Sequence, residues 1–199
     1  MVMQRWVNRK RRENGRGQSM VEFALVFPIF IMLFIGLIEF SVTFSIILNV
    51  NYASREAALL AAEIGDAQGA DCLILKGLDR ALNGATHHAG IQEVRIFWAD
   101  ANGVEKAANR YTEGGATFCT FADGSTVSVP FTAGVLNYPD SARCTVLAGC
   151  GVNHPGLDTI GVGITFHHDW LTPLPNVVQL APTGVTFTRS NTMRMEPVL

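Results

Sequence analysis

The sequence predicts an α+β fold in which a long N-terminal transmembrane helix leads into a small extracytoplasmic head with a short antiparallel sheet. Residues 21–48 are almost entirely apolar, and a helix needs only about 20 such residues to cross a bilayer. Helix-forming residues then continue as far as Ile64. Further along, residues 92–98, 161–168 and 185–195 are expected to form strands, because apolar and polar residues alternate over parts of them.

Residues 1–17 form a basic leader with six basic residues and one acidic residue, a net charge of +5. The rest of the chain has nine basic and sixteen acidic residues, a net charge of −7. Basic residues beside an apolar span stay in the cytoplasm, so we expect a cytoplasmic leader and a head that crosses the membrane. A basic run can also bind nucleic acid, but this run directly abuts the apolar segment, and no nucleic-acid partner is expected.

The predicted long helix covers residues 18–64, with a transmembrane span at about residues 21–48. The apolar stretch is too long for the core of a removable secretory signal, so we expect it to be retained. At 1.5 Å per residue the helix would be roughly 70 Å long. Pro28 is a place where it could kink, and Gly65 is a plausible end.

The second half of this helix carries an apolar stripe at three- and four-residue steps, typical of a helix that packs on a protein core. The stripe consists of Val50, Ala53, Ala57, Leu60, Ala61 and Ile64.

Residues 65–199 form the predicted head. A second helix is expected over residues 72–82, from the amphipathic spacing of its leucines. Residues 104–106 could return from a turn after the first strand, and residues 107–124 are expected to be irregular. A short strand over residues 126–129 should end at Pro130, and residues 132–159 should form a long loop.

Four cysteines lie in the predicted head: Cys72, Cys119, Cys144 and Cys150. An even number of cysteines in an oxidising compartment suggests disulfide bonds. Three pairings are possible, and we favour Cys144–Cys150, which would close a glycine-rich loop, together with Cys72–Cys119. The alternative is four free, buried thiols.

The histidines do not form a recognisable metal or catalytic motif, and we expect no cofactor, no metal and no enzymatic activity. Neighbouring residues on a strand point to opposite faces, so His167 and His168 are poorly placed to share one ion. Trp98, Phe166 and Trp170 are expected to serve the core rather than a ligand platform. The other residues considered for a metal site are His87, His88, His154 and Asp169.

The junction between the leader and the apolar segment resembles a type IV prepilin cleavage site. In such a site Gly17 precedes the cut, Gln18 becomes the new N-terminus, Glu22 is the fifth mature residue and Phe23 is the aromatic residue after it. Glycine offers a protease a backbone without side-chain hindrance. A cut after Gly15 would move the acid to position seven, so Gly17 is preferred.

The resemblance extends to the TadE-like family, minor pseudopilins of the tight-adherence (Flp) pilus machinery. It covers residues 11–64, including the pilin-like helix, and also the last dozen residues of the chain. It implies processing by a prepilin peptidase and a role in assembling, priming or decorating a pilus. The implied partners are this peptidase, other pilins or pseudopilins, inner-membrane assembly proteins and the lipid bilayer of the bacterial inner membrane.

Two acidic residues lie within the apolar segment, where a carboxylate is costly unless it is used. In a filament Glu22 could pair with the N-terminal amine of a neighbouring subunit; alternatively it is an interfacial acid favoured by the start of the helix. Glu39 lies about 25 Å further along the helix, near the far edge of the bilayer. There it either faces the headgroups or binds a basic residue of a partner.

Two other functions stay open at this point. The chain could be an uncleaved single-pass anchor whose periplasmic head binds a partner or a surface, in which case substitution of Gly17 would leave its function intact. A weaker alternative is a periplasmic enzyme that depends on a metal held by His167 or His168.

Overall fold

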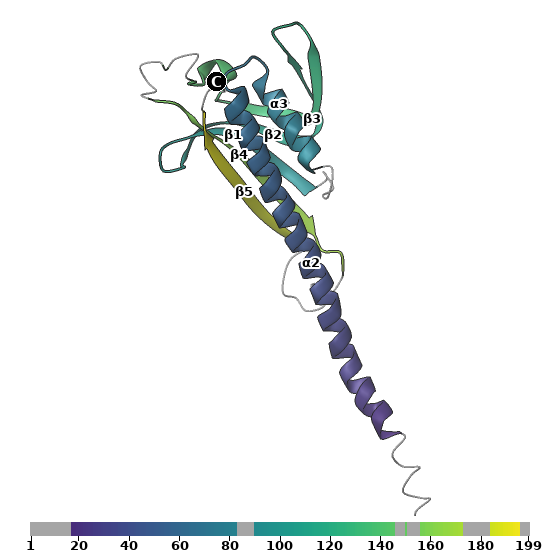
Figure 1. Ribbon diagram of the computed structural model, residues 1–199. Helices are drawn as coiled ribbons and strands as arrows, with labels where there is room; N and C mark the ends of the chain where they lie inside the picture. The colour runs from purple at the N-terminus through teal and green to yellow at the C-terminus, as the bar shows by residue number, and fades with distance from the viewer. Residues whose placement is uncertain (1–16, 83–89, 146–149, 151–155, 173–183, 196–199) are drawn as a thin grey trace, which may run out of the picture. The chain divides into compact units, whose positions relative to one another are not determined.

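The computed structural model describes residues 17–82, 90–145, 150, 156–172 and 184–195. Two helices are followed by a five-stranded sheet (Figure 1). The chain divides into two compact units, a helix unit of Met1–Val42 with Trp170–Pro182 and a head unit of Thr43–Asp169 with Thr183–Leu199. The elements are α2 (Gln18–Ile64), α3 (Ala70–Leu82), β1 (Ile91–Ala99), β2 (Glu105–Thr120), β3 (Thr126–Leu136), the 3₁₀ helix η2 (Asp140–Ala142), β4 (Thr159–Asp169) and β5 (Gly184–Arg194).

The predicted long helix is present as α2, which is continuous for 47 residues and passes through Pro28. It ends at Gly65, whose φ of 63° lies in the left-handed region that favours glycine. The backbone N–H of Gly65 donates to the carbonyl of Ala61 at 3.1 Å and completes the last turn. The prediction for α3 began two residues late but had the correct end at Leu82.

The head unit is an antiparallel sheet in the strand order β3-β2-β1-β4-β5, with α3 and the second half of α2 on one face (Figure 1). The α+β prediction is therefore confirmed. The helices and the inward residues of the strands share one hydrophobic core. Val94 and Ile96 of β1 and Val162 and Ile164 of β4 lie in it and are 0% exposed.

Alanine residues of α2 allow the helix to approach this sheet closely. Ala53, Ala57 and Ala61 are fully buried, as the predicted stripe requires. Between them, the Ser54 hydroxyl donates to the carbonyl of Val162 at 2.6 Å, so a buried polar group is satisfied at the contact. The second half of α2 is thus part of the head core.

Two predictions for the middle of the head were wrong. Residues 107–120 are not irregular but belong to β2, and β3 does not end at Pro130 but continues to Leu136. Gly114 and Gly115 have positive φ values of 90° and 79°, and the pairing register of β2 and β3 shifts there. Pro130 is tolerated because it lies opposite this shift on an edge strand, where a missing N–H costs little.

The predicted loop over residues 132–159 was also wrong in part. Residues 132–136 extend β3, Asp140–Ala142 form η2, and Thr159 begins β4. The segments 146–149 and 151–155 of that prediction lie outside the described residues. A loop rich in glycine and proline gave no sign of the strand extension, because strand pairing with β2 determines it.

Gly161 offers a test of packing on the sheet face that points away from the helices. An added Cβ would collide with the ring of Phe97, which is 4% exposed. We expect Gly161→Ala to lower the free energy of unfolding by about 1–3 kcal/mol, because an overpacked buried ring must move. Denaturant unfolding of the full chain in detergent measures this.

Gly163→Ala is the matched control on the same strand. Its Cβ would lie 3.3 Å from the Nη2 atom of Arg95, the end of a flexible side chain that can move away. Gly163→Ala should therefore lower the free energy of unfolding less than Gly161→Ala does. Equal unfolding midpoints for the two variants would contradict the packing argument.

Candidate functional site

The junction residue Gly17 lies directly before the first residue of α2. Its surroundings are open, with no atom within 4 Å of an added Cβ. The carbonyl of Gly17 accepts a hydrogen bond from the backbone N–H of Val21 at 3.3 Å, so it caps the first turn. Both Gly17 and Gln18 are exposed. The bond that the sequence predicts to be cut is therefore at an accessible helix end, while residues 1–16 of the leader lie outside the described residues.

Gln18 and Glu22 lie on the same face of α2. The side-chain amide of Gln18 donates to Oε1 of Glu22 at 3.1 Å, the i to i+4 spacing of one helical turn. Phe23 follows on the next face and packs against Phe27, with ring centroids 5.1 Å apart. Glu22 is exposed in the single chain, so its second oxygen can accept a further donor from outside. The structure thus brings the side chains of Gln18 and Glu22 together within one chain, and the pairing of Glu22 with a neighbour's N-terminal amine stays a prediction.

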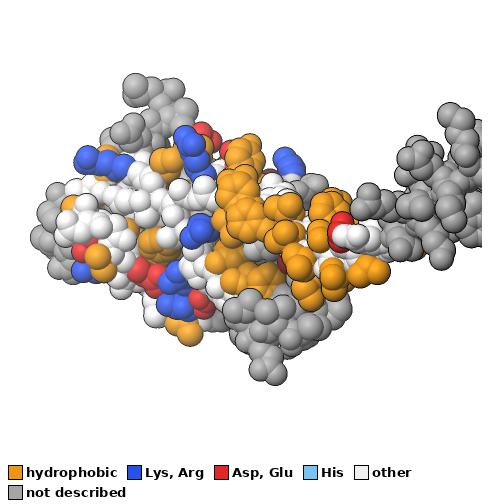
Figure 2. Space-filling view, turned by 90° about the horizontal axis from the view of Figure 1, so that it is seen from below, with side chains coloured by type: hydrophobic (Ala, Val, Ile, Leu, Met, Phe, Trp, Pro, Cys, Tyr) orange, Lys and Arg blue, Asp and Glu red, His pale blue; other side chains and the backbone are white. Residues whose placement is uncertain are grey.

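Large apolar side chains cover the first half of α2 on all sides. Phe23 is 64% exposed and Phe30 is 60% exposed, and hydrophobic side chains gather on the molecular surface in Figure 2. A helix that is apolar all round is suited to lipid or to a large helical assembly rather than to water. Within the part of the chain that is described, α2 is the helix long and apolar enough to cross a membrane. It is compatible with a single-pass membrane anchor.

Glu39 is the second acid of the apolar segment, and it is nearly buried at 6% exposure. Within the helix unit its Oε1 accepts the backbone N–H of Leu171 at 2.8 Å, and its Oε2 accepts the N–H of Thr172 at 3.2 Å. The sequence suggested headgroups or a partner for this carboxylate, and neither interpretation included this contact. No local pattern could have revealed it, because the bonded residues are 132 and 133 positions apart.

A buried ion pair joins α3 to the segment after η2. The guanidinium of Arg143, 0% exposed, donates to the carboxylate of Asp71, which is 15% exposed. Asp71 also accepts from the Tyr111 hydroxyl at 2.5 Å and from the Asn109 amide at 2.7 Å. Burial raises the pKa of the Tyr111 phenol well above its usual value, and the Asp71 charge raises it further. Tyr111 therefore remains a neutral donor to the carboxylate.

A second buried carboxylate, Asp158, orders the chain around Cys144. Asp158 accepts the Tyr138 hydroxyl at 2.7 Å and the backbone N–H of Cys144 at 2.9 Å. Burial raises the pKa of Tyr138, and its bond to Asp158 raises it further. Arg143 stacks over the Tyr138 ring at 5.1 Å, which connects the two carboxylate sites. Sequence reasoning missed both sites, because no short motif joins residues this far apart.

Both disulfide bonds favoured from the sequence are present. Cys72 of α3 bonds Cys119 of β2, and Cys144 bonds Cys150. The first bond ties the helix layer to the sheet across 47 positions, and the second closes a loop across six positions. Such cross-links restrict the unfolded chain and stabilise a small head.

The two neighbouring histidines of β4 lie on opposite faces of the sheet. His168 is 7% exposed, whereas His167 points to the other face and contacts Thr186 at 2.7 Å and Asp169 at 3.2 Å. Among the described residues, no three His, Cys, Asp or Glu side chains are grouped to hold a metal ion. His87, His88 and His154 lie outside the described residues.

The three aromatic residues predicted for the core have different positions. Phe166 is buried at 3% exposure, and Trp98 packs against the same core. Trp170 is half-buried, but it belongs to the helix unit and lies outside the described head core, so that prediction was wrong for Trp170. Its position directly after the end of β4 explains the difference, because the chain has left the sheet there.

A family model described as TadE-like protein matches residues 17–59. Over these residues the resemblance to the TadE-like family is confirmed, and for the last dozen residues of the chain it stays a prediction. The match covers the Gly17 junction and most of α2, while α3 and the five strands lie outside it. No curated protein and no solved structure matches the chain. The similarity to the TadE-like family therefore lies in the junction and in α2.

The Asp71–Arg143 pair should be essential for head stability. We expect Asp71→Asn to lower the free energy of unfolding by about 3–5 kcal/mol, because it leaves a buried guanidinium without its counter-charge. Thermal or denaturant unfolding of the full chain, with disulfides intact, measures the loss.

Glu105→Gln is the matched control, since it also removes a carboxylate that pairs with arginine. Glu105 contacts Arg95 at 2.8 Å and Arg110 at 3.0 Å, with these side chains 23–41% exposed. A pair in contact with solvent contributes no more than about 1 kcal/mol. If both variants lost the same stability, burial would not be the deciding factor.

Proposed function

We propose that this chain is a minor pseudopilin that takes part in assembling or priming a tight-adherence (Flp) pilus, after a prepilin peptidase cuts its leader at Gly17. The TadE-like match indicates a function related to the Tad pilus. The pseudopilin role and the cut at Gly17 are proposed from the junction, where an exposed glycine directly precedes an apolar helix and Glu22 follows five positions later.

The junction geometry suits cleavage by a membrane protease. Gly17 has no side chain and open surroundings, so the backbone on both sides of the bond is approachable. Cleavage would remove the basic leader that holds the N-terminus in the cytoplasm. It would also give Gln18 a positively charged amine one turn away from the Glu22 carboxylate.

The exposed surface of α2 suits both environments that a pilin-like helix must occupy. In lipid, its apolar side chains contact acyl chains. In a helical filament the same side chains would pack against other subunits, and Glu22 would pair with a neighbour's N-terminal amine, which offsets the cost of a buried carboxylate. The proposed partners are other pilins or pseudopilins and inner-membrane assembly proteins, and the chain itself has no catalytic role.

Cleavage can be tested by mass spectrometry of the N-terminus in cells with and without the peptidase. We expect Gln18 to be the first residue when the peptidase is present and the leader to be intact when it is absent. Gly17→Val should block processing, since a β-branched side chain hinders the bond.

The control variant is Gly15→Val, which alters the other glycine of the junction and should be processed normally. A leader that stays intact in both strains would contradict the proposal. The chain would then be an uncleaved anchor with a head that binds a partner or a surface.

Glu22→Gln separates the role of charge from the local hydrogen bond. The amide oxygen can still accept the Gln18 donor that lies 3.1 Å away, but it carries no charge to attract an amine. We expect normal processing and at least a tenfold lower amount of protein in the sheared pilus fraction, because a lost buried charge pair is worth about 1.4 kcal/mol or more. Immunoblotting of cell and pilus fractions measures this ratio.

Glu63→Gln is the control, because Glu63 is an exposed carboxylate near the other end of α2. It should leave the ratio of pilus to cell protein unchanged. An unchanged ratio for Glu22→Gln as well would show that the charge has no part in incorporation.

A further inference from the structure

The contact between Glu39 and the segment Trp170–Thr172 has no part in the proposed function. All of these residues belong to the helix unit. Glu39 is 6% exposed, whereas its neighbours Leu37 and Phe40 are 64% and 67% exposed. One turn of apolar surface on α2 thus contains a single carboxylate that is covered by a segment distant in the chain.

The contact satisfies two groups that would each be costly beside lipid. A carboxylate on a lipid-facing helix loses its hydration, and backbone N–H groups outside a helix or sheet have no partner in hydrocarbon. Here the two carboxylate oxygens accept the N–H groups of Leu171 and Thr172, at 2.8 Å and 3.2 Å. The two hydrogen bonds offset the desolvation cost of the carboxylate and of the backbone N–H groups. An irregular segment can therefore lie at the edge of a bilayer.

The position along α2 places this contact near the bilayer edge. Glu39 lies 18 positions after Val21, or about 27 Å along the helix, close to the roughly 30 Å thickness of the hydrocarbon core. Tryptophan is enriched at the membrane–water interface, where its ring is at headgroup level. The segment presents the half-buried Trp170 and the 62% exposed Leu171.

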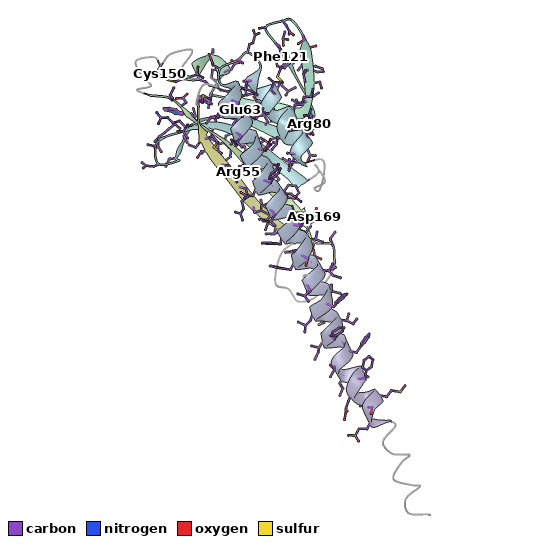
Figure 3. The ribbon with its side chains drawn as sticks, viewed as in Figure 1. Arg55, Glu63, Arg80, Phe121, Cys150 and Asp169 are labelled. Atoms are coloured by element: carbon purple, nitrogen blue, oxygen red, sulfur yellow. A yellow bond between two sulfur atoms is a disulfide. The ribbon has the colours of Figure 1, made fainter. Side chains whose placement is uncertain are left out.

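We propose that Trp170 and Leu171 form a second membrane contact, an interfacial anchor that inserts among the lipids at the outer edge of the bilayer, with Glu39 holding its backbone. This inference rests on the proposed function in that α2 must span the membrane. Leu37, Phe40 and Leu171 are large apolar side chains that are 64%, 67% and 62% exposed around this contact, and they therefore favour lipid as the occupant. Asp169, the charged end of β4 labelled in Figure 3, marks the end of the head unit before this segment.

Depth-dependent fluorescence quenching tests the anchor in full-length protein reconstituted into phosphatidylglycerol–phosphatidylcholine vesicles with brominated lipids. Trp6→Phe and Trp98→Phe leave Trp170 as the single tryptophan. We expect bromines near the headgroup end to quench Trp170 at least about twofold more than bromines near the chain end, because the ring favours the interface. Trp6→Phe with Trp170→Phe leaves Trp98 in the head as a control that should not be quenched.

Glu39→Ala in the Trp170 background tests the role of the carboxylate. We expect quenching of Trp170 to fall at least about twofold, because the two backbone N–H groups then oppose insertion. Glu63→Ala, which removes an exposed carboxylate of α2 labelled in Figure 3, should have no effect. The emission spectrum of Trp98 in a Glu39→Ala variant shows whether the head remains folded.

The outcomes separate this inference from the membrane anchor itself. Protein that floats with vesicles but shows no quenching of Trp170 would overturn the interfacial anchor and leave the α2 span intact. Protein that does not float with vesicles would overturn both. Unchanged quenching in a folded Glu39→Ala variant would overturn the role given to Glu39.

Discussion

The head depends on one contact, the burial of a stripe of small residues of α2 against the sheet. Ala53, Ala57 and Ala61 are 0% exposed, and Ser54 bonds the carbonyl of Val162 between them. Larger side chains at these positions would separate the helix from the strands, since protein interiors are close-packed. This helix and α3 together cover the inward core residues of the sheet.

The two halves of α2 therefore have surfaces that suit two different environments. Its first half has large exposed apolar residues such as Phe23 and Phe30, which suit lipid or a filament, and its second half has a narrow stripe that suits a protein core. The surface that suits lipid or a filament and the surface that packs on the head core differ in residue size. No break in α2 separates them. The helix continues through Pro28, whose lost N–H bond does not end it.

Buried charge in this molecule is used to join distant segments. Arg143 is held by Asp71, and Asp158 holds Tyr138 together with the backbone of Cys144. Such sites specify where loops lie, because a buried charge without its partner is strongly destabilising. The Cys144–Cys150 disulfide adds a covalent restraint to the same part of the chain.

The sequence by itself determined the features that are local. These are the long apolar helix and its end at Gly65, the basic leader, the alternation in β5 and the spacing of Gly17 and Glu22. Only the tertiary structure decided the extension of β3 through Pro130, the Asp71–Arg143 pair and the covering of Glu39 by Leu171 and Thr172. The physical reason is that periodicity and turn preferences act over a few residues, whereas these contacts depend on strand pairing and on partners 72 or more positions away.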